Sequence, residues 1–103
     1  LFVWDGQRFR PRHLPTGAIR GVYLDPEGTE WVGTAGDGLY WFRHGQLHHA
    51  STREGLPSDY VGGLVEDRLG YFWMTTPTQV FRIAKRDLLL LGEKKLNRVG
   101  ALV

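Results

Sequence analysis

Paired carboxylates are the side chains that general acid–base chemistry uses, and this sequence places several of them beside turn signals. They are Asp25, Glu27, Glu30 and Asp67. Asp25 and Asp67, however, open two copies of one pattern, Asp-x-x-Gly-x-x-Trp-x-x-Thr, at residues 25–34 and 67–76. An Asp that opens a turn accepts backbone N–H groups, and a Gly three residues later supplies a positive φ. We therefore interpret both aspartates as structural and predict no catalytic residue.

Histidines gather in "HGQLHH" at residues 44–49, and imidazole is a common metal ligand. A turn signal at Gly45 separates His44 from His48, while the adjacent His48 and His49 must point to opposite faces of a strand. Residues 25–30 lack the length and oxygen spacing of a calcium-binding EF-hand loop. We expect neither a metal site nor another cofactor. No common catalytic motif is present either, so the chain is not expected to be an enzyme.

Composition narrows the class of protein further. The 103 residues include 42% hydrophobic residues and no cysteine, which allows a buried core but neither disulfides nor thiolate zinc sites. No apolar run approaches the roughly 20 residues that span a bilayer. The formal net charge is only +2, and nothing indicates nucleic-acid binding. Because the chain begins at Leu1 without a signal-like segment, we expect it to be a piece of a longer protein.

The repeated pattern must be positioned by repeated elements. Residues 18–34 align with residues 60–76, which gives a period of about 40 residues, typical of propeller blades or of helical solenoids. Short segments rich in aromatic and β-branched residues alternate with Gly, Pro and Asp turns, which favours strands. The strands predicted for the first unit are 18–24, 29–34, 38–43 and 46–51. Four antiparallel strands per unit are typical of one propeller blade.

The predicted fold is therefore all-β, with four-stranded antiparallel β-propeller blades. We divide the chain into the end of a preceding blade at 1–17, a full blade at 18–59, and a second blade with a variant tail at 60–103. In that tail we expect a short helical turn ending at Gly92 and then a further strand. About two and a half blades cannot close a ring, which takes at least about four. Either the propeller is incomplete, or it is completed by oligomerisation.

Each residue of the repeated pattern has a predicted structural role. The indoles of Trp31 and Trp73 should fill the space between adjacent sheets. The hydroxyls of Thr34 and Thr76 should tie neighbouring turns. Small residues on the first strand of each unit should allow crowded strands to approach. These small residues are Gly21, Gly62 and Gly63.

A ligand site is expected in the loops at one end of the blades, because loops vary while blades stay fixed. For a sugar-like ligand, Tyr60 would stack against the ring, and four polar side chains would hydrogen-bond to it. The polar side chains are Arg20, Asp37, Asp59 and Gln79.

The pattern and its flanks resemble the two-component regulator propeller repeat. The resemblance rests on the two Asp-x-x-Gly-x-x-Trp-x-x-Thr copies, on "GLY" at 38–40, on "EGLPSDYVGGLVED" at 54–67 and on the tail at 80–96. It implies the extracytoplasmic, periplasmic sensor of a histidine kinase or hybrid two-component system, which binds oligosaccharides or other small molecules. Contact with the membrane would then come only through other parts of the parent protein. "TTPTQV" at 75–80 departs from the family pattern because it lacks Gly-Gly-Leu.

The expected function is thus a ligand-sensing propeller segment with a small-molecule or carbohydrate ligand. It would work as a homo-oligomer or within a larger propeller. Two alternatives remain open: a propeller enzyme that acts as a polysaccharide lyase or hydrolase, and a scaffold whose open edges bind another protein.

Overall fold

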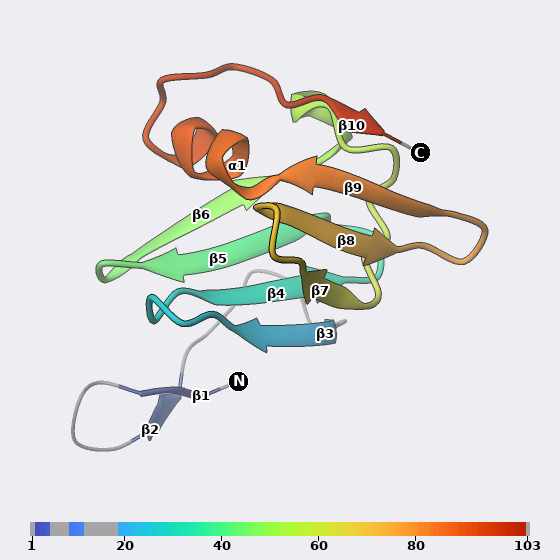
Figure 1. The fold of residues 1–103 in the computed structure, drawn as a ribbon. Coiled ribbons are helices and arrows are strands. Elements are labelled where there is room, and N and C mark those ends of the chain that lie inside the picture. The colour runs from blue at the N-terminus through green and yellow to red at the C-terminus, as the bar shows by residue number, and fades with distance from the viewer. Residues whose placement is uncertain (1, 5–8, 12–18, 103) are drawn as a thin grey trace.

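Two four-stranded antiparallel sheets make up most of the computed structural model (Figure 1). The structure describes residues 2–4, 9–11 and 19–102. The first sheet runs in chain order through β3 (Ile19–Leu24), β4 (Glu30–Thr34), β5 (Leu39–Arg43) and β6 (Gln46–Ala50). The second contains β7 (Leu64–Glu66), β8 (Tyr71–Thr75), β9 (Val80–Ala84) and β10 (Ala101–Leu102). The all-β class and the strands predicted for the first unit are confirmed.

The remaining elements connect or precede these sheets. A 3-10 turn, η1 (Thr52–Glu54), lies in the link between them. The helix α1 (Lys85–Gly92) is inserted between the third and fourth strands of the second sheet, which confirms the predicted helical turn and final strand. The strands β1 (Phe2–Trp4) and β2 (Phe9–Pro11) pair antiparallel with each other. The rest of the predicted N-terminal segment 1–17 lies outside the described residues.

Both copies of the repeated pattern fold into the same turn. Gly28 and Gly70 have φ values of 89° and 87°, in the left-handed region that glycine adopts without strain. Oδ1 of Asp25 accepts hydrogen bonds from the backbone N–H groups two and four residues later, at 3.0 and 2.8 Å. Oδ1 of Asp67 repeats this arrangement at 2.8 and 3.0 Å. The structural interpretation of the two aspartates is confirmed.

The indole and the hydroxyl of each pattern are also fixed by hydrogen bonds. Trp31 Nε1 donates to Asp25 Oδ2 at 2.9 Å, and Trp73 Nε1 donates to Asp67 Oδ2 at 2.8 Å. Thr34 Oγ1 donates to the carbonyl of Gly38 at 2.8 Å. In the second copy, the hydroxyl oxygen of Thr76 accepts from the backbone N–H groups of residues 78 and 79. Each pattern is therefore a closed set of hydrogen bonds that shapes the turns at both ends of a strand.

The first sheet passes very close to the end of the link, just before β7 begins. A Cβ added to Gly21 would lie 2.0 Å from the carbonyl oxygen of Gly62, a distance that no real side chain tolerates. A Cβ on Gly33 would lie 2.4 Å from the carbonyl oxygen of Val61. The backbones can pass at this distance only because both positions of the first sheet lack a side chain. The predicted use of small residues on the first strands is confirmed at Gly21.

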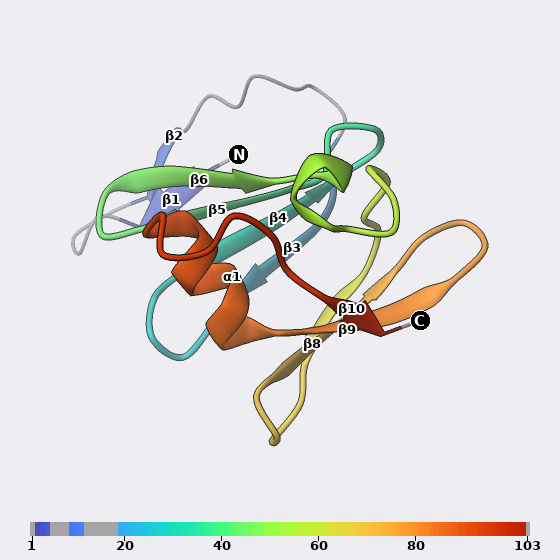
Figure 2. The ribbon, with the colours of Figure 1, turned by 90° about the horizontal axis from the view of Figure 1, so that it is seen from above.

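Away from this contact the two sheets diverge, and α1 lies between them near β6 and β9 (Figure 2). The core that fills the space comes from facing strands. Trp31 stacks on Trp41 with ring centroids 5.0 Å apart, and Phe72 of the second sheet lies 4.6 Å from Trp31. Other buried members of this core are Leu39, Met74, Phe81, Ile83 and Leu88. The first sheet therefore presents one whole face to the second.

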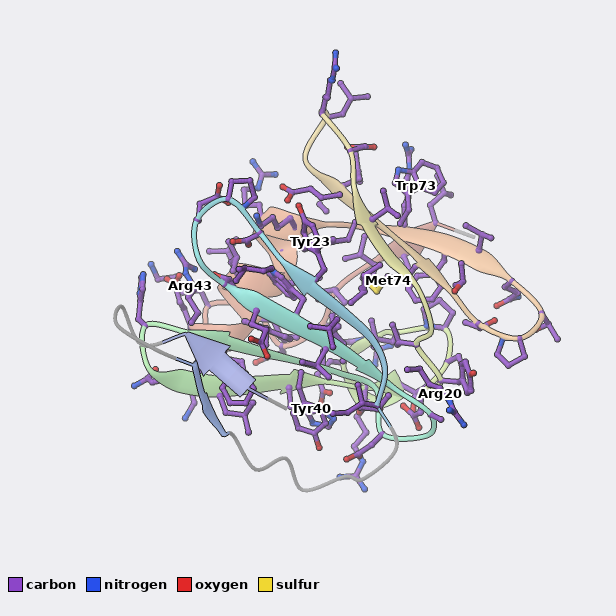
Figure 3. All side chains as sticks on the ribbon, turned by 90° about the horizontal axis from the view of Figure 1, so that it is seen from below. Arg20, Tyr23, Tyr40, Arg43, Trp73 and Met74 are labelled. Carbon is purple, nitrogen blue, oxygen red and sulfur yellow. The ribbon has the colours of Figure 1, made fainter. Side chains whose placement is uncertain are left out.

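The two repeated tryptophans differ in burial. Trp31 has no exposed surface, as predicted, whereas 39% of Trp73 is exposed. Neighbouring residues of β8 point to opposite faces of the sheet, so Met74 lies in the core and Trp73 lies on the outer side. Both side chains are labelled in Figure 3. The predicted packing of Trp73 between sheets is thus wrong within the described chain, because no described element covers that side of β8.

Replacing the two tryptophans separately should reveal this difference. Trp31→Ala removes a fully buried indole and should lower the free energy of unfolding by about 3–5 kcal/mol. Trp73→Ala removes a partly exposed indole and should cost clearly less. Urea unfolding followed by circular dichroism measures both losses. An equal loss of unfolding free energy in both variants would contradict the conclusion that Trp31, but not Trp73, lies in the core.

Candidate functional site

The five predicted ligand residues do not form one site. Asp37 and Asp59 line the same hollow at one end of the first sheet. Arg20 is exposed on β3 and is labelled in Figure 3. Tyr60 is half-buried and pairs with Ala35 through a single β-bridge. Gln79 is exposed in the β8–β9 turn, and neither it, Tyr60 nor Arg20 lines the hollow.

The hollow has a volume of about 320 Å³ and a polar lining. Its walls come from the β4–β5 turn, the end of β6 and the link that leads to the second sheet. The described residues that line it are Asp37, His49, Ser51, Thr52, Arg53, Glu54 and Asp59. We call this set the polar hollow.

Asp59 holds the two sides of the polar hollow together. Its carboxylate accepts hydrogen bonds from the backbone N–H and the hydroxyl of Thr52, at 2.8 and 3.3 Å. Its backbone carbonyl accepts from the N–H groups of Gly36 and Gly38, at 3.1 and 2.7 Å. Asp59 therefore connects the start of the link to the β4–β5 turn.

Ser51 and Glu54 fix the backbone at the start of the link by hydrogen bonds. Ser51 Oγ accepts from the N–H of Arg53 at 3.2 Å, and Glu54 Oε1 accepts from the N–H of Ser51 at 2.8 Å. This reciprocal pair is a capping box at the start of η1. The sequence analysis did not assign these residues to the site, although the spacing Ser-x-x-Glu could have predicted the turn.

The opposite wall is made by Asp37 and His49, and Tyr40 contacts both of them from outside the lining. Tyr40 donates its hydroxyl to Asp37 Oδ2, and its ring stacks on the imidazole of His49 with centroids 4.4 Å apart. His49 Nε2 lies 2.6 Å from the carbonyl oxygen of Asp37. Burial, together with the hydrogen bond to Asp37, raises the pKa of Tyr40 to about 12. Tyr40 therefore remains a neutral donor that orients one carboxylate oxygen of Asp37.

This arrangement suits a small ligand that both donates and accepts hydrogen bonds. Carboxylates at Asp37 and Asp59 can accept, while the exposed guanidinium of Arg53 can donate. Three residues that line the hollow, His49, Thr52 and Arg53, were assigned by sequence only to an outer strand and a link. Their presence in the hollow depends on how the link returns from the end of β6 to the β4–β5 turn, where Asp59 accepts from Gly36 and Gly38, and the alternation of polar and apolar residues does not predict that path.

A second cluster of charged residues lies between the two sheets, at the start of α1. Lys85 Nζ lies 2.8 Å from Asp25 Oδ2, 2.7 Å from Glu27 Oε1 and 3.2 Å from Glu66 Oε2. Tyr23 donates its hydroxyl to Glu66 Oε1 at 3.0 Å. Three carboxylates from two sheets thus surround one ammonium group. Only 10% of the Lys85 side chain and none of the Asp25 side chain are exposed, so this ion pair is shielded from water, whereas 66% of the Glu27 side chain is exposed.

The protonation of this cluster follows from its contacts. Burial alone would disfavour the charged form of Lys85, but hydrogen bonds to the three carboxylates outweigh it and raise the Lys85 pKa. Burial likewise opposes ionisation of Asp25, yet hydrogen bonds from Lys85, Trp31 and Thr29 hold its pKa below the usual value. An ammonium with a raised pKa is not an amine nucleophile near neutral pH. We interpret the cluster as a cross-link between the sheets.

The histidines predicted to lie on opposite strand faces do so. His48 stacks on Trp41 with centroids 5.6 Å apart, whereas His49 stacks on Tyr40. Burial, followed by the nearby charge of Arg43, lowers the pKa of His48. Within the part of the chain that the structure describes, no group of three or more His, Cys, Asp or Glu side chains could hold a metal ion.

The comparisons with known proteins give no family. No protein-family model matches the sequence, and no curated protein matches it. In residues 2–4, 9–11 and 19–102, no helix has the length and apolar character needed to cross a membrane.

Removing the carboxylate of Asp25 should weaken the cross-link. Asp25→Asn leaves Lys85 buried with one charged partner fewer, and it should lower the free energy of unfolding by about 3 kcal/mol. Asp67→Asn changes the equivalent residue on the open side of the second sheet and should have a smaller effect. Urea unfolding at pH 7 measures both. An equal effect would contradict the cross-link.

The pH dependence of stability should report the same group. Because the folded-state pKa of Asp25 lies below the ordinary value of 3.8, its stabilisation is present above that pH. It is lost as the pH falls through the folded-state pKa. Thermal unfolding between pH 6 and pH 2 should therefore show a smaller acid loss for Asp25→Asn than for the unmodified chain. Parallel curves would count against this assignment.

Proposed function

We propose that the chain is a ligand-sensing segment of a β-propeller, in the periplasmic part of a bacterial two-component sensor, without enzymatic activity of its own. In this proposal the two four-stranded sheets are consecutive blades, and β1 and β2 belong to the blade before them. The repeated turn pattern, the matching strand order of the two sheets and the face-to-face core support the assignment.

The polar hollow is the observation that carries the ligand-binding part of the proposal. It brings Asp37 and Asp59, two of the five residues predicted from sequence, within one cavity of about 320 Å³. That volume is at the lower end of the roughly 300–1,000 Å³ of small-molecule sites. Its carboxylates and guanidinium fit the hydroxyl groups of a mono- or disaccharide. A small hydroxylated molecule is therefore the class of ligand that we assign.

The position of the polar hollow suggests how binding is transmitted. One wall belongs to the first sheet, and the other belongs to the link that leads to the second sheet. A ligand that contacts both walls favours the conformations in which they stay together. Binding would then alter the populations of the link, and with them the relation between neighbouring repeats.

Saccharide binding tests this proposal. We expect glucose, maltose or glucuronate, titrated separately into ¹⁵N-labelled chain, to shift the amide signals of residues 49–59 in a saturable manner. Arg53→Ala should weaken this binding at least tenfold because it removes the guanidinium at the rim. Arg68→Ala is the matched control, since Arg68 lies in the β7–β8 turn, outside the hollow.

Two results would contradict the assignment. One is the absence of saturable shifts with all three saccharides. The other is saturable binding that Arg53→Ala leaves unchanged while shifts appear outside residues 49–59.

A further inference from the structure

The second sheet has one face that the described chain leaves open. Cross-strand pairing puts Val65, Trp73 and Arg82 side by side on it, and Thr75 opposite Val80. Val65 is 62% exposed and Val80 is 54% exposed. The members that we use are Val65, Asp67, Tyr71, Trp73, Val80 and Arg82, and we call them the outward face. Apolar surface gathered in this way commonly marks an interaction site.

The outward face of the second sheet corresponds, strand by strand, to the face of the first sheet that the second sheet covers. In the first sheet, Tyr23, Trp31 and Trp41 are paired across neighbouring strands as Val65, Trp73 and Arg82 are in the second. The second sheet covers that surface with alternate residues of β8 and β9. They are Phe72, Met74, Phe81 and Ile83. The chain thus contains one complete example of how such a face is covered.

Asp67 repeats the anion half of the cross-link. Its carboxylate accepts from the backbone N–H groups two and four residues later and from the indole N–H of Trp73, at distances close to those of the equivalent bonds of Asp25. The hydrogen bonds from the Tyr71 N–H and the Trp73 indole lower the pKa of Asp67, so it is a carboxylate at neutral pH. Asp25 receives the ammonium of Lys85, whereas no ion pair reaches Asp67 from the described residues. The positive charge of Arg82 contributes to the lowered pKa of Asp67 without forming an ion pair with it, so the position that Lys85 occupies beside Asp25 has no counterpart beside Asp67 among the described residues.

The outward face also has a preformed hollow beside this half-site. It measures about 370 Å³ and includes Tyr71 and Arg82 in its lining, together with residues of β10. The guanidinium of Arg82 lies 4.4 Å from the ring centroid of Tyr71 and 5.7 Å from that of Trp73. These contacts hold the aromatic rings and the guanidinium in one layer, so an apolar partner meets an ordered surface.

We propose that the outward face docks a further four-stranded antiparallel repeat of the same kind, which lays alternate apolar side chains on Val65 and Trp73 and places a lysine ammonium on Asp67. The inference rests on the repeat architecture of the proposed function but not on ligand binding. A second folded copy is not the assigned occupant, because its own Lys85 and the inner face of its second sheet are already engaged.

One difference between the faces defines the docking geometry. Thr75 stands where the first sheet has Gly33, and a Cβ at Gly33 would come within 2.4 Å of the link. The further repeat must therefore sit farther from the Thr75 end than the second sheet sits from the first. The contact should be tightest around Val65 and Asp67, at the opposite end of these strands.

The experiment adds a further repeat to the full chain, so that the outward face has a partner to bind. A copy of residues 51–102 is appended after Leu102, so that the link again follows a fourth strand. The sequence contains no cysteine, so Val65→Cys introduces a single reporter thiol on the outward face. Leu24→Cys is the matched control, since Leu24 is 59% exposed and lies on the first sheet. The rate of maleimide labelling measures how well each thiol is covered.

We expect the appended repeat to slow labelling of the Val65→Cys thiol at least tenfold and to leave labelling of the Leu24→Cys thiol unchanged. Lys85→Met in the appended copy alone should restore most of the rate at position 65, because it removes the ammonium and keeps an apolar stem. Thr75→Gly in the original sheet should slow labelling at position 65 further. A labelling rate at position 65 that the appended repeat does not affect, with either Thr or Gly at position 75, would overturn the proposal.

Self-association provides an independent check on the occupant. The unextended Val65→Cys chain should be labelled at a rate that does not depend on protein concentration. Protection that grows with concentration would mean that a second copy covers the outward face, and it would overturn the assignment to a further repeat. Saccharide titration of the same chain reports on the polar hollow only, so the two proposals can fail separately.

Discussion

One ammonium group joins the two halves of this structure. Lys85 meets three carboxylates, of which Asp25 and Glu27 belong to the first sheet and Glu66 to the second. A buried charge of this kind is stable only while its partners stay in place, and removing one partner leaves an uncompensated charge. The angle between the sheets is therefore restricted at the very position where α1 begins.

The hydrophobic core and the cross-link depend on one another. Trp31 fills the space between the sheets, and its indole N–H holds the carboxylate that receives Lys85. Phe72 lies against Trp31 on one side, and the ammonium of Lys85 lies 5.6 Å from the centroid of the Phe72 ring. Apolar packing excludes water from the ion pairs, and the ion pairs fix the register in which the apolar side chains meet.

Local features of the fold could be predicted from sequence because they depend on neighbours in the chain. The turns at Asp25 and Asp67, the glycine conformations and the strands of the first sheet all follow from short patterns. The different burial of Trp31 and Trp73 could not be predicted, because identical patterns do not state what packs against each copy. Lys85 was missed for a similar reason: a lysine after a strand is ordinarily solvated, and its three partners are 19 to 60 positions away.

The residues of the candidate site could likewise be predicted only where they depend on local sequence. Asp37 and Asp59 were predicted to lie at one end of the sheet, and they do share the polar hollow. Tyr60 and Gln79 lie in loops as expected but not in that hollow, since the first part of the link returns to the β4–β5 turn through Asp59 before the chain reaches β7. Arg53 and His49 became candidates only once this path was known. Loop paths depend on tertiary hydrogen bonds such as those of Asp59, which no local pattern encodes.

The contact between Gly21 and Gly62 has a consequence for how such a chain can change over time. Backbone against backbone leaves no adjustable side chain, so the spacing between the first sheet and the segment that leads into β7 is fixed at this point. The far edge has no such restriction, and α1 occupies it as an insertion between β9 and β10. Sequence length can therefore be gained or lost at the far edge of a sheet while the spacing between the two sheets is preserved. New surface could evolve there without disturbing the neighbours.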